Sequence, residues 1–132
     1  MMPVQTSYIM SKHAVLAFSE CLRLEMQVKK APIQVSVIMP GAVRTRIFTD
    51  SKGAMDPVTR HHRKLMEQWL EANGISAREA AERILPQIAA GEFWVSTHPE
   101  MTREYAAGRA HHLAELATPI LLPDRAASLE VQ

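Results

Sequence analysis

The sequence has little cysteine: Cys21 is the single cysteine among 132 residues. One thiol cannot form an internal disulfide, which excludes a disulfide-stabilised secreted scaffold and favours the reducing cytoplasm as the location. The thiol lies in an apolar, helical stretch, so we expect it to be buried and unreactive. Long apolar runs are also missing. None reaches the roughly 18 residues of a membrane span, and the first residues lack the parts of a signal peptide.

An excess of charge of either sign is missing as well. The formal net charge is +1, from 15 Lys and Arg against 14 Asp and Glu, with no block of one sign. We therefore expect neither a nucleic acid nor a membrane as a partner. Hydrophobic residues make up 47% and charged residues 22% of the chain, which is typical of a soluble globular protein.

The histidines are not spaced like metal ligands. His61 and His62 are adjacent, as are His111 and His112, so their side chains point about 100° apart on a helix. A zinc-binding helix instead places ligands four residues apart. We expect these histidines to face solvent, and we predict no metal site. His98 precedes a proline, and we interpret it as a turn residue.

The hydrophobic pattern predicts six elements, four helices and two strands. In chain order they are a helix over about 7–30, a strand over 33–39, a helix from Pro57 to Asn73, a helix over about 77–90, a strand over 92–97 and a helix over about 100–117. Thr6 or Ser7 can cap the first helix, Asp56 the second, and Ser76 the third. Two strands joined through helices imply a parallel pair in an α/β fold, as in a doubly wound sheet.

Tyr8 and Lys12 are the residues that first suggest chemistry. Their separation of four places both side chains on one helical face, one turn apart. A phenol ordinarily loses its proton near about pH 10, and a neighbouring ammonium favours the phenolate. The spacing therefore suits a tyrosine that transfers a proton at working pH. The same spacing also arises in ordinary surface contacts, as we expect for Tyr105 and Arg109.

The order of the motifs resembles a known family. The Tyr-x-x-x-Lys pair is followed by a long helix, a buried strand and Pro-Gly-x-Val-x-Thr at residues 40–45. This combination resembles the short-chain dehydrogenase/reductase family, strongly over residues 7–48 and more weakly over 75–100. The resemblance covers the C-terminal half of the family's Rossmann-like domain. We therefore expect residues 1–132 to form a single partial domain, with residues 42–74 as the substrate loop and helix.

The resemblance implies an oxidoreductase that uses NAD(H) or NADP(H) and acts on a small alcohol or carbonyl substrate. Tyr8 would be the general acid/base, and Lys12 would favour the phenolate and bind the nicotinamide ribose. After the Pro40-Gly41 turn, the backbone at Val43 and the Thr45 hydroxyl would hold the nicotinamide amide or a phosphate. The residues alone also allow a plain turn at Pro40-Gly41 and a helix cap at Thr45.

Parts of the family pattern are missing from this sequence. Its glycines are too far apart for the glycine-rich phosphate loop; they are Gly41, Gly53, Gly74, Gly91 and Gly108. The family's catalytic serine lies farther upstream of the tyrosine than the seven residues that precede Tyr8. Ser7 and Ser11 do not replace it by position, and the upstream asparagine is missing too. We therefore expect the 132-residue chain alone to be inactive.

Two hypotheses remain open at this point. In the first, the chain is part of an NAD(P)(H)-dependent oxidoreductase with Tyr8 and Lys12 as the acid/base pair. In the second, it is an inactive fragment of that family that acts as an interaction or folding unit. Under either hypothesis, the first helix is apolar on two sides, so we expect homo-oligomers that form through residues 9–28.

Overall fold

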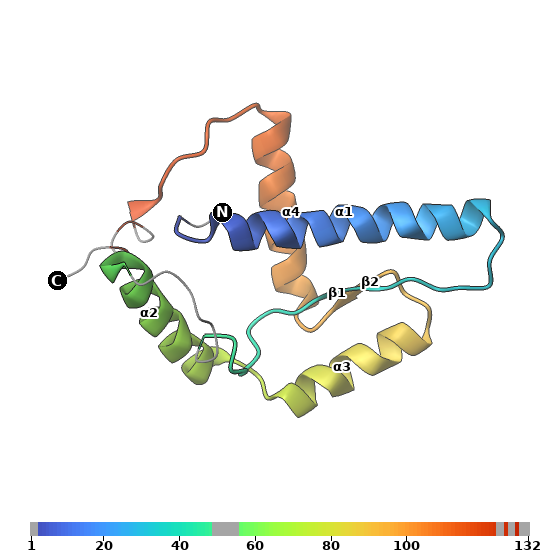
Figure 1. Cartoon of the computed structure of the whole chain (residues 1–132), viewed down its shortest axis with the longest axis horizontal. Helices are drawn as coiled ribbons and strands as arrows, with labels where there is room; N and C mark the ends of the chain where they lie inside the picture. The colour runs from blue at the N-terminus through green and yellow to red at the C-terminus, as the bar shows by residue number, and fades with distance from the viewer. Residues whose placement is uncertain (1–2, 49–55, 124–125, 127–128, 130–132) are drawn as a thin grey trace.

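The computed structural model of the chain describes residues 3–48, 56–123, 126 and 129, which form helices around a short sheet (Figure 1). In chain order the elements are α1 (Thr6–Val28), β1 (Val37–Met39), α2 (Pro57–Asn73), α3 (Ala77–Ala89), β2 (Trp94–Ser96) and α4 (Pro99–Ala114). The predicted order of elements and the α/β fold class are confirmed.

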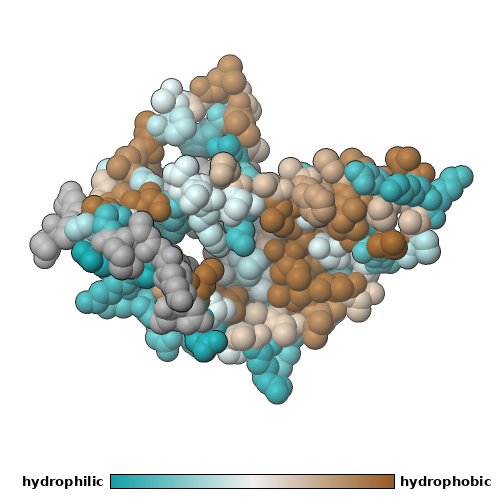
Figure 2. Space-filling model, viewed as in Figure 1, coloured by the Kyte–Doolittle hydropathy of each residue, from teal (hydrophilic) through white to brown (hydrophobic). Residues whose placement is uncertain are grey.

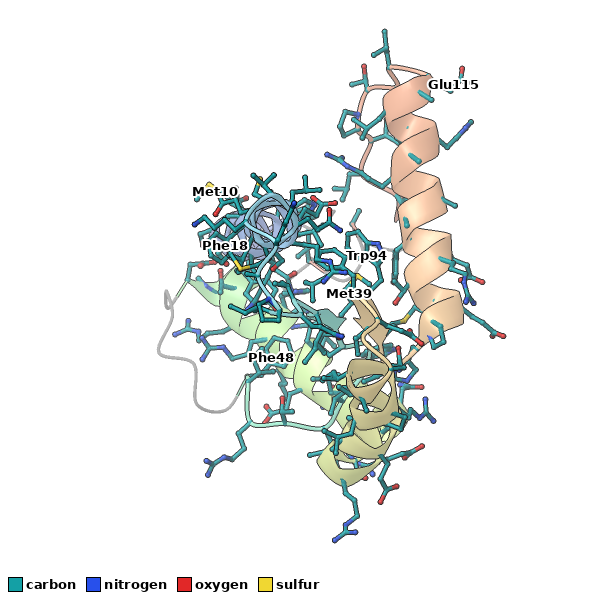
Figure 3. All side chains as sticks on the ribbon, turned by 90° about the vertical axis from the view of Figure 1, so that its right-hand side faces the viewer. Met10, Phe18, Met39, Phe48, Trp94 and Glu115 are labelled. Atoms are coloured by element: carbon teal, nitrogen blue, oxygen red, sulfur yellow. The ribbon has the colours of Figure 1, made fainter. Side chains whose placement is uncertain are left out.

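The sheet consists of β1 and β2, which run parallel. Val37 pairs with Trp94, and Met39 pairs with Ser96. Figures 1 and 3 both place α1 on one side of the strand pair and α3 on the other. The described residues thus form three layers, as in part of a doubly wound sheet, because parallel strands need crossover connections that cover both faces.

The starts of two helices follow the predicted capping chemistry. The Asp56 side chain accepts a hydrogen bond of 3.0 Å from the Thr59 amide at the start of α2. At the start of α3, the Ser76 hydroxyl accepts one of 3.1 Å from Glu79. Helix α3 ends at Ala89, and Gly91 follows it with a φ of 75°, in the left-handed region that glycine adopts without strain.

The predicted cap of α1 is wrong. Gln5 is the residue that begins this helix, and its side chain makes no capping hydrogen bond. Thr6 and Ser7 already lie within the first turn, so their hydroxyls are past the capping position.

Several predicted boundaries are too wide, and one predicted segment is only partly described. The strand over 33–39 is reduced to Val37–Met39, and Ile33 is exposed. The last helix ends at Ala114, and Leu116 has a φ of 49°. Residues 49–55 of the predicted loop over 42–56 lie outside the described part of the chain. Among the helices that the structure describes, none combines the length and hydropathy of a membrane span.

The hydrophobic core is small. The buried apolar residues are Val37, Ala42, Ala80 and Val95. Helix α1 contributes no buried residue, and Cys21 on this helix is exposed, so the prediction of a buried thiol is wrong. The chain exposes 9985 Å², whereas a compact monomer of 14.8 kDa exposes about 7,000 Å². Much apolar surface of this chain therefore has no cover within it, including part of the brown surface in Figure 2.

Candidate active site

Tyr8 and Lys12 meet on the first turns of α1, as their spacing predicts. The Nζ atom of Lys12 lies 5.3 Å from the centroid of the Tyr8 ring. An ammonium at this distance over an aromatic face is attracted by the ring electrons, which holds the two side chains together. Tyr8 is 48% exposed, so the phenol is open to a molecule that approaches from solvent.

The turn after β1 is built around Gly41. The Gly41 amide donates a hydrogen bond of 2.8 Å to the hydroxyl of Thr97, at the end of β2. A Cβ atom at position 41 would overlap the His98 ring and the end of the Met101 side chain. A side chain at position 41 would therefore require the His98 and Met101 side chains to move, so this close approach favours glycine.

The segment after the turn is fixed by backbone pairing. Val43 forms a parallel bridge with Ile75, in the connection between α2 and α3. The Arg44 amide donates to the Ile75 carbonyl at 2.9 Å, and the Ile75 amide donates to the Ala42 carbonyl at 3.0 Å. Thr45 is exposed just beyond this bridge. It caps none of the described helices, so its hydroxyl is available to another group.

The two groups of predicted site residues lie at the same end of the molecule. Helix α1 and β1 run in opposite directions, so the start of α1 and the end of β1 share one side of Figure 1. In parallel α/β sheets, ligands bind at the carboxyl ends of the strands. Within the described ranges, no hydrogen bond joins Tyr8 or Lys12 directly to residues 40–45.

The sequence reasoning missed the polar cluster behind the turn. Thr97 is 1% exposed, and its hydroxyl also lies 2.8 Å from Nδ1 of His98. The Thr97 carbonyl accepts a hydrogen bond of 2.9 Å from Arg83, and the Gln87 amide bonds both backbone groups of Ser96. The sequence did contain a signal for this cluster. Polar residues follow one another at the end of this strand, where a buried strand would otherwise continue with apolar residues.

His62 also contradicts the sequence-based expectation. It is 4% exposed rather than solvent-facing, and its Nε2 atom lies 2.9 Å from Nε2 of Gln5. Burial, together with the neighbouring charge of His61, holds the pKa of His62 below its ordinary value of 6.5. Helical spacing alone did not reveal that the start of α1 covers this face of α2.

Comparisons with known proteins identify the family. A family model described as short chain dehydrogenase matches residues 1–56. The chain is 37% identical over 93 residues to dehydrogenase/reductase SDR family member 7B of Mus musculus, a match that covers 65% of this chain. It is 34% identical over 119 residues to dehydrogenase/reductase SDR family protein 7-like of Anopheles gambiae, a match that covers 85% of this chain. The chain belongs to the short-chain dehydrogenase/reductase family.

The family resemblance predicted from the motifs is thereby confirmed. The matches cover 24% of the Mus musculus relative and 32% of the Anopheles gambiae relative, so the chain spans about a quarter to a third of their length. No solved structure gives a significant match to this short-chain dehydrogenase/reductase sequence. The part of the chain that matches the family model, residues 1–56, includes Tyr8, Lys12 and the whole turn over 40–45.

Proposed function

We propose that this chain supplies the acid/base half of an NAD(P)(H)-dependent oxidoreductase that acts on an alcohol or carbonyl compound. The Tyr8 hydroxyl gives its proton to the carbonyl oxygen during reduction and takes it back during oxidation. The cofactor supplies the hydride acceptor or donor. The positive charge of Lys12 stabilises the negative charge left on the phenol oxygen.

The described residues fit one side of such a cofactor. The Lys12 ammonium is a donor for ribose hydroxyl groups, beside the exposed phenol of Tyr8. The backbone at Val43 and the exposed Thr45 hydroxyl follow the tight Gly41 turn, where they can contact an amide or a phosphate. The sequence holds no glycine-rich loop for a pyrophosphate, so these residues account for only part of the binding site.

One observation carries this proposal: the contact of 5.3 Å between Lys12 and the Tyr8 ring, on an exposed helix start at the same end of the molecule as the end of β1. The carboxyl ends of the strands are where parallel α/β sheets bind ligands. The family match over residues 1–56 includes both groups and supports the same assignment.

A second candidate function is that of an inactive interaction or folding unit. It is favoured by the exposed apolar side chains of α1, of which Phe18 is 65% and Val28 is 83% exposed. Such surface marks a protein interaction site when nothing within the chain covers it.

The DNA that precedes the codon of Met1 separates the two candidates. We expect it to encode, in frame, a βαβ unit with a glycine-rich loop. The protein that contains both parts should reduce a carbonyl probe with NADH or NADPH, and the same protein with Tyr8→Phe should not. An upstream region without such a unit, or a combined protein whose activity is unchanged by Tyr8→Phe, would favour the interaction unit.

A further inference from the structure

A contact between two distant segments lies next to the proposed acid/base pair. Gln5 begins α1, three residues before Tyr8, and its side-chain amide lies 2.9 Å from the buried ring of His62 on α2. The two residues are 57 positions apart in the sequence, so the contact joins the start of α1 to α2. Both segments meet at one end of the molecule (Figure 1).

The chemistry of the contact fixes the state of the ring. An amide NH₂ group can only donate, so Nε2 of His62 accepts and the ring proton lies on Nδ1. The buried Nδ1 atom has no hydrogen-bond partner among the residues that the structure describes. Among the described residues, Gln5 is therefore the one hydrogen-bond partner of the neutral His62 ring. Loss of this hydrogen bond would leave a buried polar ring unpaired.

We propose that His62 is a positioning residue, whose contact with Gln5 fixes α2 against the helix start that carries Tyr8. This inference rests on the proposed function, since α2 belongs to the segment over 42–74 that the family resemblance assigns to the substrate. The contact sets how far the substrate-side helix lies from the phenol. His62 acts through Gln5 and does not itself touch the reacting atoms.

The contact weakens in acid. A proton on Nε2 removes the acceptor that the Gln5 amide needs and places a positive charge in a buried site. The titratable or charged groups nearest to His62 along α2 are Arg60, His61, Arg63 and Lys64, and those that follow Gln5 on α1 are Tyr8 and Lys12. None of these is a carboxylate. The pKa of His62, which burial and His61 lower, agrees with this arrangement.

The test replaces Gln5, the hydrogen-bond partner of the His62 ring, with a negatively charged residue. Histidine ring signals of the labelled 132-residue chain would be followed by NMR from about pH 8 to about pH 5, in the wild type, Gln5→Glu and Gln27→Glu. Gln27 is an exposed glutamine at the other end of α1, so Gln27→Glu makes the same charge change away from His62. Hydrogen exchange would be measured on the wild type, Gln5→Ala and Gln27→Ala.

In the wild type, His62 should titrate below the ordinary histidine value of 6.5. Gln5→Glu should raise the midpoint of His62 above its wild-type value, because a carboxylate favours the imidazolium, whereas Gln27→Glu should leave it in place. Gln5→Ala should speed amide exchange in the first turn of α1 and also in the first half of α2, and Gln27→Ala should do neither.

A wild-type His62 that titrates at the ordinary histidine value would overturn the inference, and that measurement needs no variant to fold. An unchanged midpoint in Gln5→Glu, or faster exchange confined to α1, would overturn it as well. None of these measurements depends on turnover. If the combined protein lacks oxidoreductase activity while Gln5→Glu shifts His62, the proposed function fails and the contact stands.

Discussion

The buried hydroxyl of Thr97 accepts a hydrogen bond of 2.8 Å from the backbone amide of Gly41. This bond joins the ends of β1 and β2, at the turn that we assign to the cofactor. The Thr97 side chain is 1% exposed, so water cannot replace the hydroxyl as the acceptor. The geometry of the turn therefore depends on a residue of the neighbouring strand, 56 positions away.

Thr97→Val removes this acceptor and leaves the shape of the side chain nearly unchanged. The half-buried Gly41 amide then loses its partner, which we expect to destabilise the turn by up to roughly 1–3 kcal/mol. Amide hydrogen exchange at Gly41, measured by NMR, should become faster by the factor that corresponds to this loss of free energy.

Thr97→Ser is the matched control for this change. It keeps the hydroxyl and loses only a methyl group, so exchange at Gly41 should stay close to that of the wild type. Equal exchange at Gly41 in Thr97→Val and Thr97→Ser would show that packing around residue 97, rather than its hydroxyl, holds the turn.

Tyr8→Phe should remove the proposed proton transfer from any longer protein that shows oxidoreductase activity. General acid/base catalysis contributes about 10²–10⁴-fold, so kcat should fall by that range while the fold is retained. Lys12→Met should act nearly as strongly, because it removes the charge beside the phenol and a ribose contact. Steady-state kinetics measure both effects, with circular dichroism as the check on folding. A Tyr8→Phe enzyme that retains most of its kcat would contradict the acid/base assignment.

The 132-residue chain alone should show no dehydrogenase activity and should bind NAD(H) or NADP(H) only very weakly. It lacks a glycine-rich loop, and the backbone amides of such a loop donate many of the hydrogen bonds that bind a pyrophosphate. Isothermal titration calorimetry of the purified chain with NADH and with NADPH measures this directly. Micromolar affinity for either cofactor would be incompatible with the partial site described above.

Local signals were sufficient to predict the elements and the local part of the site. The spacing of Tyr8 and Lys12 on one helix fixed their contact, because side chains four residues apart meet on a helical face. The caps at Asp56 and Ser76 were also predictable, since each bonds an amide three residues later. The parallel pairing of the strands followed from the helices between them.

Features that depend on distant segments were not predictable in this way. His62 is buried by contact with the start of α1, and nothing in the sequence around it encodes that contact. Thr97 holds the turn after β1 because its hydroxyl accepts a hydrogen bond from the Gly41 amide, which lies far away in the sequence. The prediction for Cys21 is wrong in the opposite direction. Its apolar neighbours suggest burial, but no layer within the described chain covers that side of α1.

The assembly of the isolated chain gives the last prediction. The Val37 amide donates at 2.7 Å to the carbonyl of Phe93, the residue just before β2, so the backbone groups of the next residue, Ile38, face the open edge of β1. An unpaired edge of this kind is a template for another strand. Helix α1 adds exposed apolar side chains and contributes none to the core. We therefore expect the purified chain to be oligomeric, molten or aggregation-prone at micromolar concentration.

If an ordered dimer forms, its interface should lie on residues 9–28 of α1. Phe18→Glu should then weaken association, because it places a charge within apolar surface that the partner would bury. Tyr105→Glu on α4 is the matched control, since Tyr105 is 66% exposed and Phe18 is 65% exposed. Analytical ultracentrifugation of both variants measures the effect. A compact wild-type monomer with sharp, cooperative unfolding would mean that the chain closes its own core, and would contradict both the edge argument and the interface.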